Sequence, residues 1–169
     1  ALCLDLARTY RLHLGQADAA EEVYRFILDA IDPDDPEALL GLDELLDGET
    51  RWEDLAAIIE RRLAALEDPS ERRPLLLRLG QIYADELEKL DRASDHYREV
   101  LGMDPDDSEA LERLAAIEAA REDWPALYEI YRLQVERIED DEGRATLYAS
   151  MARVAGERLG EVDEAGSLW

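Results

Sequence analysis

The chain has 169 residues, of which 47% are hydrophobic and 37% charged, and its formal net charge is −24. Nucleic acid is excluded as an expected ligand because binding it requires a basic face, and an acidic membrane surface would repel this charge. Cys3 is the one cysteine, so there is no intrachain disulfide, and no apolar run approaches the roughly 20 residues of a membrane span. These features favour a cytoplasmic location. The first residue is Ala1 and not methionine, so we expect the chain to be part of a longer protein.

Apolar residues recur at helical spacing from one end of the chain to the other. Leu75, Leu79, Tyr83 and Leu87, for example, lie four residues apart in sequence, which places them on one helix face. In chain order, we expect helices over residues 2–15, 19–31, 36–47, 52–66, 71–88, 92–102, 108–120, 124–139, 143–159 and 163–169. Paired in order, they make five antiparallel hairpins, the last of them incomplete.

The sequence repeats itself at a fixed period. The acidic stretch 32–39 recurs as 104–111, and Trp52 recurs as Trp124 at the same offset. Such self-similarity is typical of repeat architectures, in which stacked units form one continuous core. We expect a single repeat domain over 1–169, with unit one at 1–72, unit two at 73–144 and a partial unit three at 145–169. The tryptophans are our candidates for buried anchors between hairpins.

Acidic residues mark the expected helix starts. Asp35 before Pro36 and Asp107 before Ser108 are placed to cap the helices that follow. Thr50 with Glu53 has the spacing of a capping box. A further set of aspartates is expected just ahead of the second helix of a hairpin: Asp18, Asp91 and Asp163.

One hairpin of each unit resembles the tetratricopeptide repeat family. The best match consists of Leu79-Gly80-x-x-Tyr83 in the first helix, Ala93 and Tyr97 in the second, and the closing Pro105, with one extra residue in the turn between the helices. The alternate hairpins diverge, since Asp43 or Ala115 stands where the glycine would be. The resemblance implies an all-α, right-handed superhelical solenoid that binds a protein or peptide.

The resemblance also implies which residues face a partner. In this family the first helices of the hairpins line a concave surface, next to the Leu-Gly pair. In this chain the corresponding positions are Leu4, Arg8, Arg11, Leu77, Gln81, Ala84, Asp85, Ala149, Arg153 and Glu157. The arginines are placed to hold a partner's carboxylate, and the alternative is that they pair with neighbouring glutamates.

The sequence gives no indication of catalytic or metal chemistry. The acidic loops lack the central glycine and distal glutamate of an EF-hand, so capping is the preferred explanation. His13 and His96 do not occupy equivalent positions, which disfavours a zinc site. No nucleophile or phosphate-binding motif is present, so we expect a non-enzymatic protein without a cofactor.

Three functions remain open at this point. The leading hypothesis is a protein-interaction or scaffold module. The second is a structural spacer, or a segment that self-associates through exposed ends. The third is an acidic module that binds a basic protein, whose affinity would fall steeply with salt.

Overall fold

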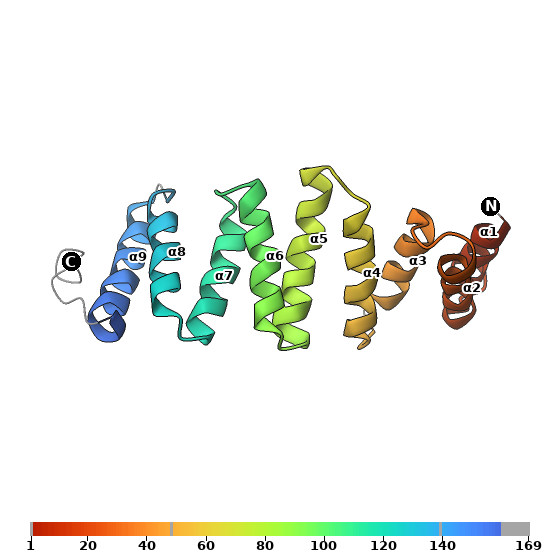
Figure 1. Ribbon diagram of the computed structural model, residues 1–169, viewed down its shortest axis with the longest axis horizontal. Coiled ribbons are helices and arrows are strands. Elements are labelled where there is room, and N and C mark those ends of the chain that lie inside the picture. Colours follow the sequence, from red (N-terminus) through yellow and green to blue (C-terminus); the bar gives the residue numbers. More distant parts are fainter. Residues whose placement is uncertain (1, 48, 139, 160–169) are drawn as a thin grey trace. The chain divides into compact units, whose positions relative to one another are not determined.

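A computed structural model describes residues 2–47, 49–138 and 140–159, and every regular element in these ranges is helical (Figure 1). The α-helices are α1 (Leu2–Arg8), α2 (Ala17–Ala30), α3 (Pro36–Leu46), α4 (Trp52–Ala64), α5 (Pro69–Gln81), α6 (Leu90–Met103), α7 (Ser108–Ala120), α8 (Trp124–Val135) and α9 (Asp141–Arg153). Three of them continue as π-helical segments, η1 (Thr9–His13), η2 (Ile82–Glu86) and η3 (Val154–Leu159). The expected all-α class is confirmed, while the helix expected over 163–169 lies outside the described residues.

The chain forms two compact units, residues 1–89 and 90–169. In the first, α1 and η1 pack on α2, α2 on α3, α3 on α4, and α4 on α5 and η2. In the second, α6 packs on α7, α7 on α8, and α8 on α9 and η3. Each helix therefore contacts mainly its neighbours in sequence, as in repeat proteins. The repeat boundaries expected after residues 72 and 144 describe the period of the sequence, and they stay a prediction.

Side chains of aspartate cap the helices that follow the duplicated loops, as expected. The Asp35 carboxylate accepts hydrogen bonds from the backbone N–H groups of Glu37 and Ala38 at 3.1 and 2.8 Å. Asp107 accepts one from Ala110 at 3.0 Å. The loops therefore end one helix and start the next, using N–H groups that no helical carbonyl satisfies.

Two details of the expected helix starts are wrong. The N-cap of α4 is Arg51, without a side-chain cap, so Thr50 and Glu53 do not form the expected capping box. Asp18 and Asp91 lie inside the first turns of α2 and α6 and not ahead of them. There a carboxylate still interacts favourably with the helix dipole.

The extra residue expected in an inter-helix turn is instead absorbed by a π-helical segment. The backbone N–H of Leu87 bonds the carbonyl of Ile82, and that of Leu14 bonds the carbonyl of Thr9, both five residues back. The segment ends at a left-handed residue, Gly15 with φ 63° in the first copy and Glu88 with φ 52° in the second. The turn thus has the same construction in both copies.

The core consists of aliphatic side chains and the repeated tyrosines. Tyr24 and Tyr97 are 1% exposed, so the aromatic position of the second helix is a core position in both copies. The tryptophans are not fully buried anchors as expected, because Trp52 and Trp124 are half-buried at the first positions of α4 and α8. Cys3 is half-buried, as expected for a small apolar residue.

Candidate partner-binding surfaces

Arg8 and Arg11 of the first hairpin are paired with acidic residues. Arg8 Nη1 lies 3.5 Å from Asp5, and its Nη2 forms an ion pair with Glu37. Arg11 forms an ion pair with Glu44. Since Glu37 and Glu44 both belong to α3, the ion pairs join the first helices of two successive hairpins. Arg8 and Arg11 thus pair with neighbouring acidic residues, and whether the predicted arginines bind a partner stays a prediction.

These four charged residues surround a cavity of about 200 Å³, together with Leu40, Gly41 and Tyr24. Burial raises the pKa of the Tyr24 hydroxyl above 10.0. The Nε atom of Arg11 is buried without a hydrogen-bond partner in the part of the chain described. The cavity is small and its charges are balanced, so an acidic partner would have to displace a glutamate from an arginine.

The residues of the third hairpin that were predicted to contact a partner differ in their exposure to solvent. Leu77 is only 9% exposed, so it is a core residue and not an exposed contact for a partner, contrary to expectation. Gln81 and Asp85 are exposed and Ala84 is half-buried, all within about one turn of each other at the α5–η2 junction. Leu4 of the first hairpin is half-buried.

The predicted residues of the fifth hairpin share one surface. Ala149, Arg153 and Glu157 line a cavity of about 550 Å³, whose other lining residues also belong to α9 and η3. Arg153 and Glu157 are exposed. Spacing of four residues places the three side chains one above another on a helix, which is why the sequence pattern could group them.

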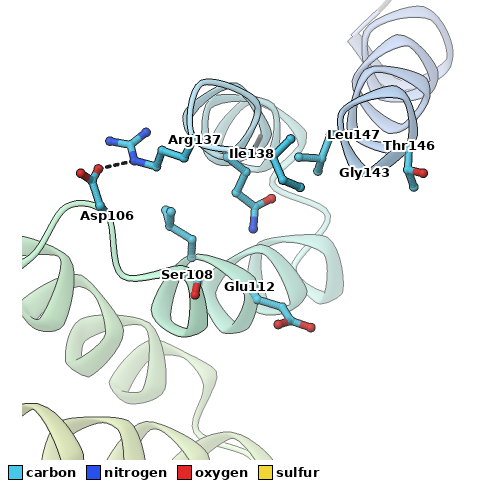
Figure 2. A pocket seen from close by; sticks show the side chains of 10 residues that line it. Asp106, Ser108, Glu112, Arg137, Ile138, Gly143, Thr146 and Leu147 are labelled. Atoms are coloured by element: carbon cyan, nitrogen blue, oxygen red, sulfur yellow. Dashed lines mark hydrogen bonds and ion pairs between the residues drawn. The ribbon is translucent and has the colours of Figure 1, made fainter. Parts of the chain in front are cut away.

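A second cavity of the same unit, which sequence reasoning missed, lies at the ends of three helices. It has a volume of about 450 Å³ and is lined from α7, from the end of α8 with the loop after it, and from the start of α9 (Figure 2). Its apolar lining is Leu111, Ile138 and Leu147. Its polar lining consists of Asp106, Ser108, Glu112, Gln134, Arg137 and Thr146, with Gly143 completing it. We call it the α7–α9 cavity.

Ion pairs and hydrogen bonds fix one side of this cavity. Arg137 forms an ion pair with Asp106 across the mouth, drawn as a dashed line in Figure 2, and Nη1 of Arg137 donates to the Leu133 carbonyl at 2.5 Å. Nη2 of Arg144 donates to the carbonyl of Ile138 at 3.0 Å. The loop after α8 is thereby tied to both its neighbours, so the cavity wall is preformed.

Two of the residues that line this cavity differ from their counterparts in the preceding copy of the repeat. Gly143 and Thr146 correspond there to Glu71 and Pro74. A Cβ at Gly143 would lie 2.9 Å from Cδ1 of Ile138, so glycine lets α9 approach this side chain. The signal in the sequence that could have indicated the site is Gly143, which stands where the preceding copy has Glu71.

No group of three or more His, Cys, Asp or Glu side chains within the described ranges is placed to hold a metal ion. In the duplicated loops, Asp32 and Asp104 instead accept hydrogen bonds from the backbone N–H groups of Asp34 and Asp106 at 3.1 and 3.0 Å. The loop oxygens thus serve the turn itself. None of the described helices is long and apolar enough to cross a membrane.

Comparison with known proteins agrees with this architecture. The tetratricopeptide repeat family model matches residues 74–107. A crystal structure of MamA is similar with a TM-score of 0.60 and 19% identity, covering 99% of this chain and 86% of that one. YrrB, described as a tetratricopeptide repeat protein with an unusual peptide-binding site, has a TM-score of 0.59 and 16% identity, with coverages of 98% and 80%. PilF of Pseudomonas aeruginosa has a TM-score of 0.54 and 18% identity, with coverages of 98% and 71%.

The chain has a tetratricopeptide-like helical-repeat fold. The matched range contains the residues that carried the resemblance, from Leu79-Gly80 through Tyr97 to Pro105. No curated protein sequence matches the chain. The tetratricopeptide-like fold sets which helix faces are available to a partner, and the partner has to be argued from the surfaces.

Proposed function

We propose that this chain is a non-catalytic protein-interaction module, and that its α7–α9 cavity receives an apolar side chain of a protein or peptide partner. The observation that carries the proposal is an open cavity of about 450 Å³ lined by Leu111, Ile138 and Leu147 in an otherwise highly charged chain. That volume lies in the range of small-ligand sites, which are mostly apolar with a few polar groups. Tetratricopeptide-like folds support a role in binding proteins or peptides.

The charge of the chain indicates which residues should flank the inserted side chain. Glu112 lies at the cavity, as does Asp106, whose charge is balanced by Arg137, and the formal net charge of the whole chain is −24. Complementary charge speeds association and disfavours acidic partners. A partner segment with an aromatic or aliphatic residue beside lysine or arginine therefore fits this surface best.

A library of random dodecapeptides displayed on phage tests the proposal. We expect selection on the whole chain to enrich peptides with one apolar residue flanked by basic residues. Thr146→Phe fills the cavity from α9 and should weaken binding of the enriched peptides at least tenfold. Pro74→Phe introduces the same side chain at the equivalent position of the preceding copy and should leave binding unaltered.

Each other outcome contradicts a defined part of the proposal. If no peptide is enriched, the chain is not a peptide-binding module of this kind. If peptides bind equally well to both variants, the binding surface lies away from the α7–α9 cavity. If high salt abolishes binding and Thr146→Phe has no effect, the acidic-module hypothesis is correct instead.

A further inference from the structure

The cavity of about 200 Å³ in the first unit, which we call the Arg11 cavity, has two polar atoms that its own residues leave unsatisfied. Nε of Arg11 and Oε1 of Glu37 are both buried, and neither takes part in a hydrogen bond within the part of the chain described. Oε1 of Glu37 does belong to the ion pair with Arg8, and Nη1 of Arg11 belongs to the ion pair with Glu44. The charges are therefore balanced, while one donor and one acceptor are left over.

The apolar part of the lining comes from Tyr24 and Leu40. Tyr24 is 1% exposed, and Cε2 and Cε1 of its ring lie 2.6 and 2.7 Å from the position that a Cβ of Gly41 would take. Only glycine therefore leaves room for the ring beside α3. Leu40 is 42% exposed, so this part of the lining can be reached from solvent.

The volume and the charges restrict what the Arg11 cavity can accept. Small-ligand sites usually have about 300–1,000 Å³, so a smaller cavity suits a single side chain. A carboxylate would compete with Glu44 for Arg11, and a cation would compete with Arg8, in each case leaving a partly buried charge without its partner. A neutral group that both accepts and donates avoids this cost. A carboxamide has its acceptor and its donors on separate atoms, which suits two unsatisfied atoms that belong to different helices.

We propose that the Arg11 cavity binds the carboxamide side chain of a glutamine or asparagine residue of a protein partner. Its oxygen accepts a hydrogen bond from Nε of Arg11, and its NH₂ group donates one to Oε1 of Glu37. Its methylene groups lie against Leu40 and the ring of Tyr24. The side chains of Arg8 and Glu44 are each 49% exposed, so they can shift to admit the group while both ion pairs are kept.

Nuclear magnetic resonance titrations of the whole chain test this proposal with three probes, the N-acetyl methylamides of glutamine, glutamate and methionine. We expect the glutamine probe to shift the signals of the Gly41 amide and the Arg11 Nε–H until they saturate. The other two probes should bind at least tenfold more weakly. Glutamate has to displace Glu44, and methionine leaves the buried donor and acceptor unpaired.

Two variants and a matched control locate the site. Arg11→Lys keeps the positive charge beside Glu44 but has no Nε–H, and Leu40→Glu adds a charge where the lining meets solvent, so each should weaken binding of the glutamine probe at least tenfold. Phe26→Glu makes a similar change at a residue of α2 that is 54% exposed and does not line the cavity, and it should leave binding unaltered.

Three results would overturn the proposal. Tighter binding of the glutamate probe would mean that the arginines hold a carboxylate. Equal binding of the glutamine and methionine probes would mean that the cavity recognises only apolar groups, and no saturable shift with any probe would mean that it is not a binding site. The α7–α9 cavity belongs to the other unit, so each of these results leaves the peptide selection described above unaffected.

Discussion

Gly41, in the middle of α3, is a position where one added methyl group should lower the stability of the fold. A Cβ built there would lie 2.6 and 2.7 Å from the ring carbons Cε2 and Cε1 of Tyr24, and closer still to Cζ. Tyr24 is 1% exposed, so its ring has no free space to move into. We therefore expect Gly41→Ala to destabilise the first unit.

The magnitude follows from two opposing effects. Overpacking of a rigid core costs about 1–3 kcal/mol, and contact with a buried ring places Gly41→Ala near the upper value. Replacing glycine by alanine inside a helix contributes about 1 kcal/mol in the opposite direction. The expected net loss is about 2 kcal/mol, the difference between these two effects. Gly102 in α6 has no atom within 4 Å of a built Cβ, so Gly102→Ala has no overpacking cost and should stabilise by about 0.5–1 kcal/mol.

Urea unfolding followed by circular dichroism measures both changes, and hydrogen exchange assigns each one to its unit. In a Tyr24→Leu background the ring is absent, so Gly41→Ala should stabilise by about 1 kcal/mol, and the double-mutant cycle should give a coupling of about 3 kcal/mol. A Gly41→Ala variant as stable as the parent chain would refute the packing argument.

Three further substitutions test other parts of the structure. Two hydrogen bonds from Arg51, at 2.7 and 2.8 Å, lower the pKa of Glu21 from 4.5 to about 2. Because the folded-state pKa is depressed, the Glu21–Arg51 pair contributes stability that is fully present above pH 4.5 and is lost as the pH falls through about 2. Because the Arg51 side chain is 40% exposed, solvent screens the pair and we expect it to contribute about 1–2 kcal/mol. Urea unfolding should show Glu21→Gln to be less stable than the parent chain by this amount near neutral pH. The difference between the two proteins should shrink under strongly acidic conditions. Glu88→Gly should raise the unfolding free energy by about 1 kcal/mol, since a φ of 52° strains glutamate and not glycine. Trp124→Ala should cost about 1–2 kcal/mol in the same assay, below the roughly 3–5 kcal/mol of a buried tryptophan, because the ring is half-buried with the Arg158 guanidinium 4.7 Å from its centroid.

The fold could be predicted from the sequence because the signals for each helix lie within its own stretch of sequence. The caps at Asp35 and Asp107 depend only on residues two or three positions away, and the apolar stripe through Leu75 and Leu79 depends only on helical spacing. Duplication then shows that the same pattern occurs twice, which makes an accidental match improbable. Local signals of this kind do not depend on the tertiary packing.

Features that depend on packing between helices could not be predicted in the same way. The burial of Leu77 depends on which neighbours cover α5, and the half-burial of Trp124 depends on its place at the first position of a helix. The α7–α9 cavity is lined by residues of separate elements, such as Gly143 of α9 beside Ile138 of the loop after α8. Sequence spacing on a single helix contains no information about such pairs.

The two copies differ at an ion cluster of the first unit that has a buried aspartate at its centre. Asp43, whose side chain is 4% exposed, is paired with Arg62 of α4 and with Arg78 of α5, the latter at 2.6 Å. We call this group the Asp43 clamp; it joins α3, α4 and α5. Only Asp43 of this group is buried, since the side chains of Arg62 and Arg78 are 23% and 31% exposed. Loss of one arginine leaves Asp43 paired with the other, whereas loss of both would leave a buried charge unpaired, at a cost of about 3–5 kcal/mol. Replacement of all three charges avoids that cost.

The next copy lacks all three charges, since Ala115, Gln134 and Ser150 stand at the positions that correspond to the members of the Asp43 clamp. Gln134 lines the α7–α9 cavity, so the open site lies beside the position that the clamp occupies in the first unit. At these positions a partner that inserts between α7, α8 and α9 has no buried ion pair to break. The same change removes charges that would have had to lose their hydration beside an apolar ligand. The divergence at these positions is therefore what one expects if the Asp43 clamp serves stability and the α7–α9 cavity serves binding.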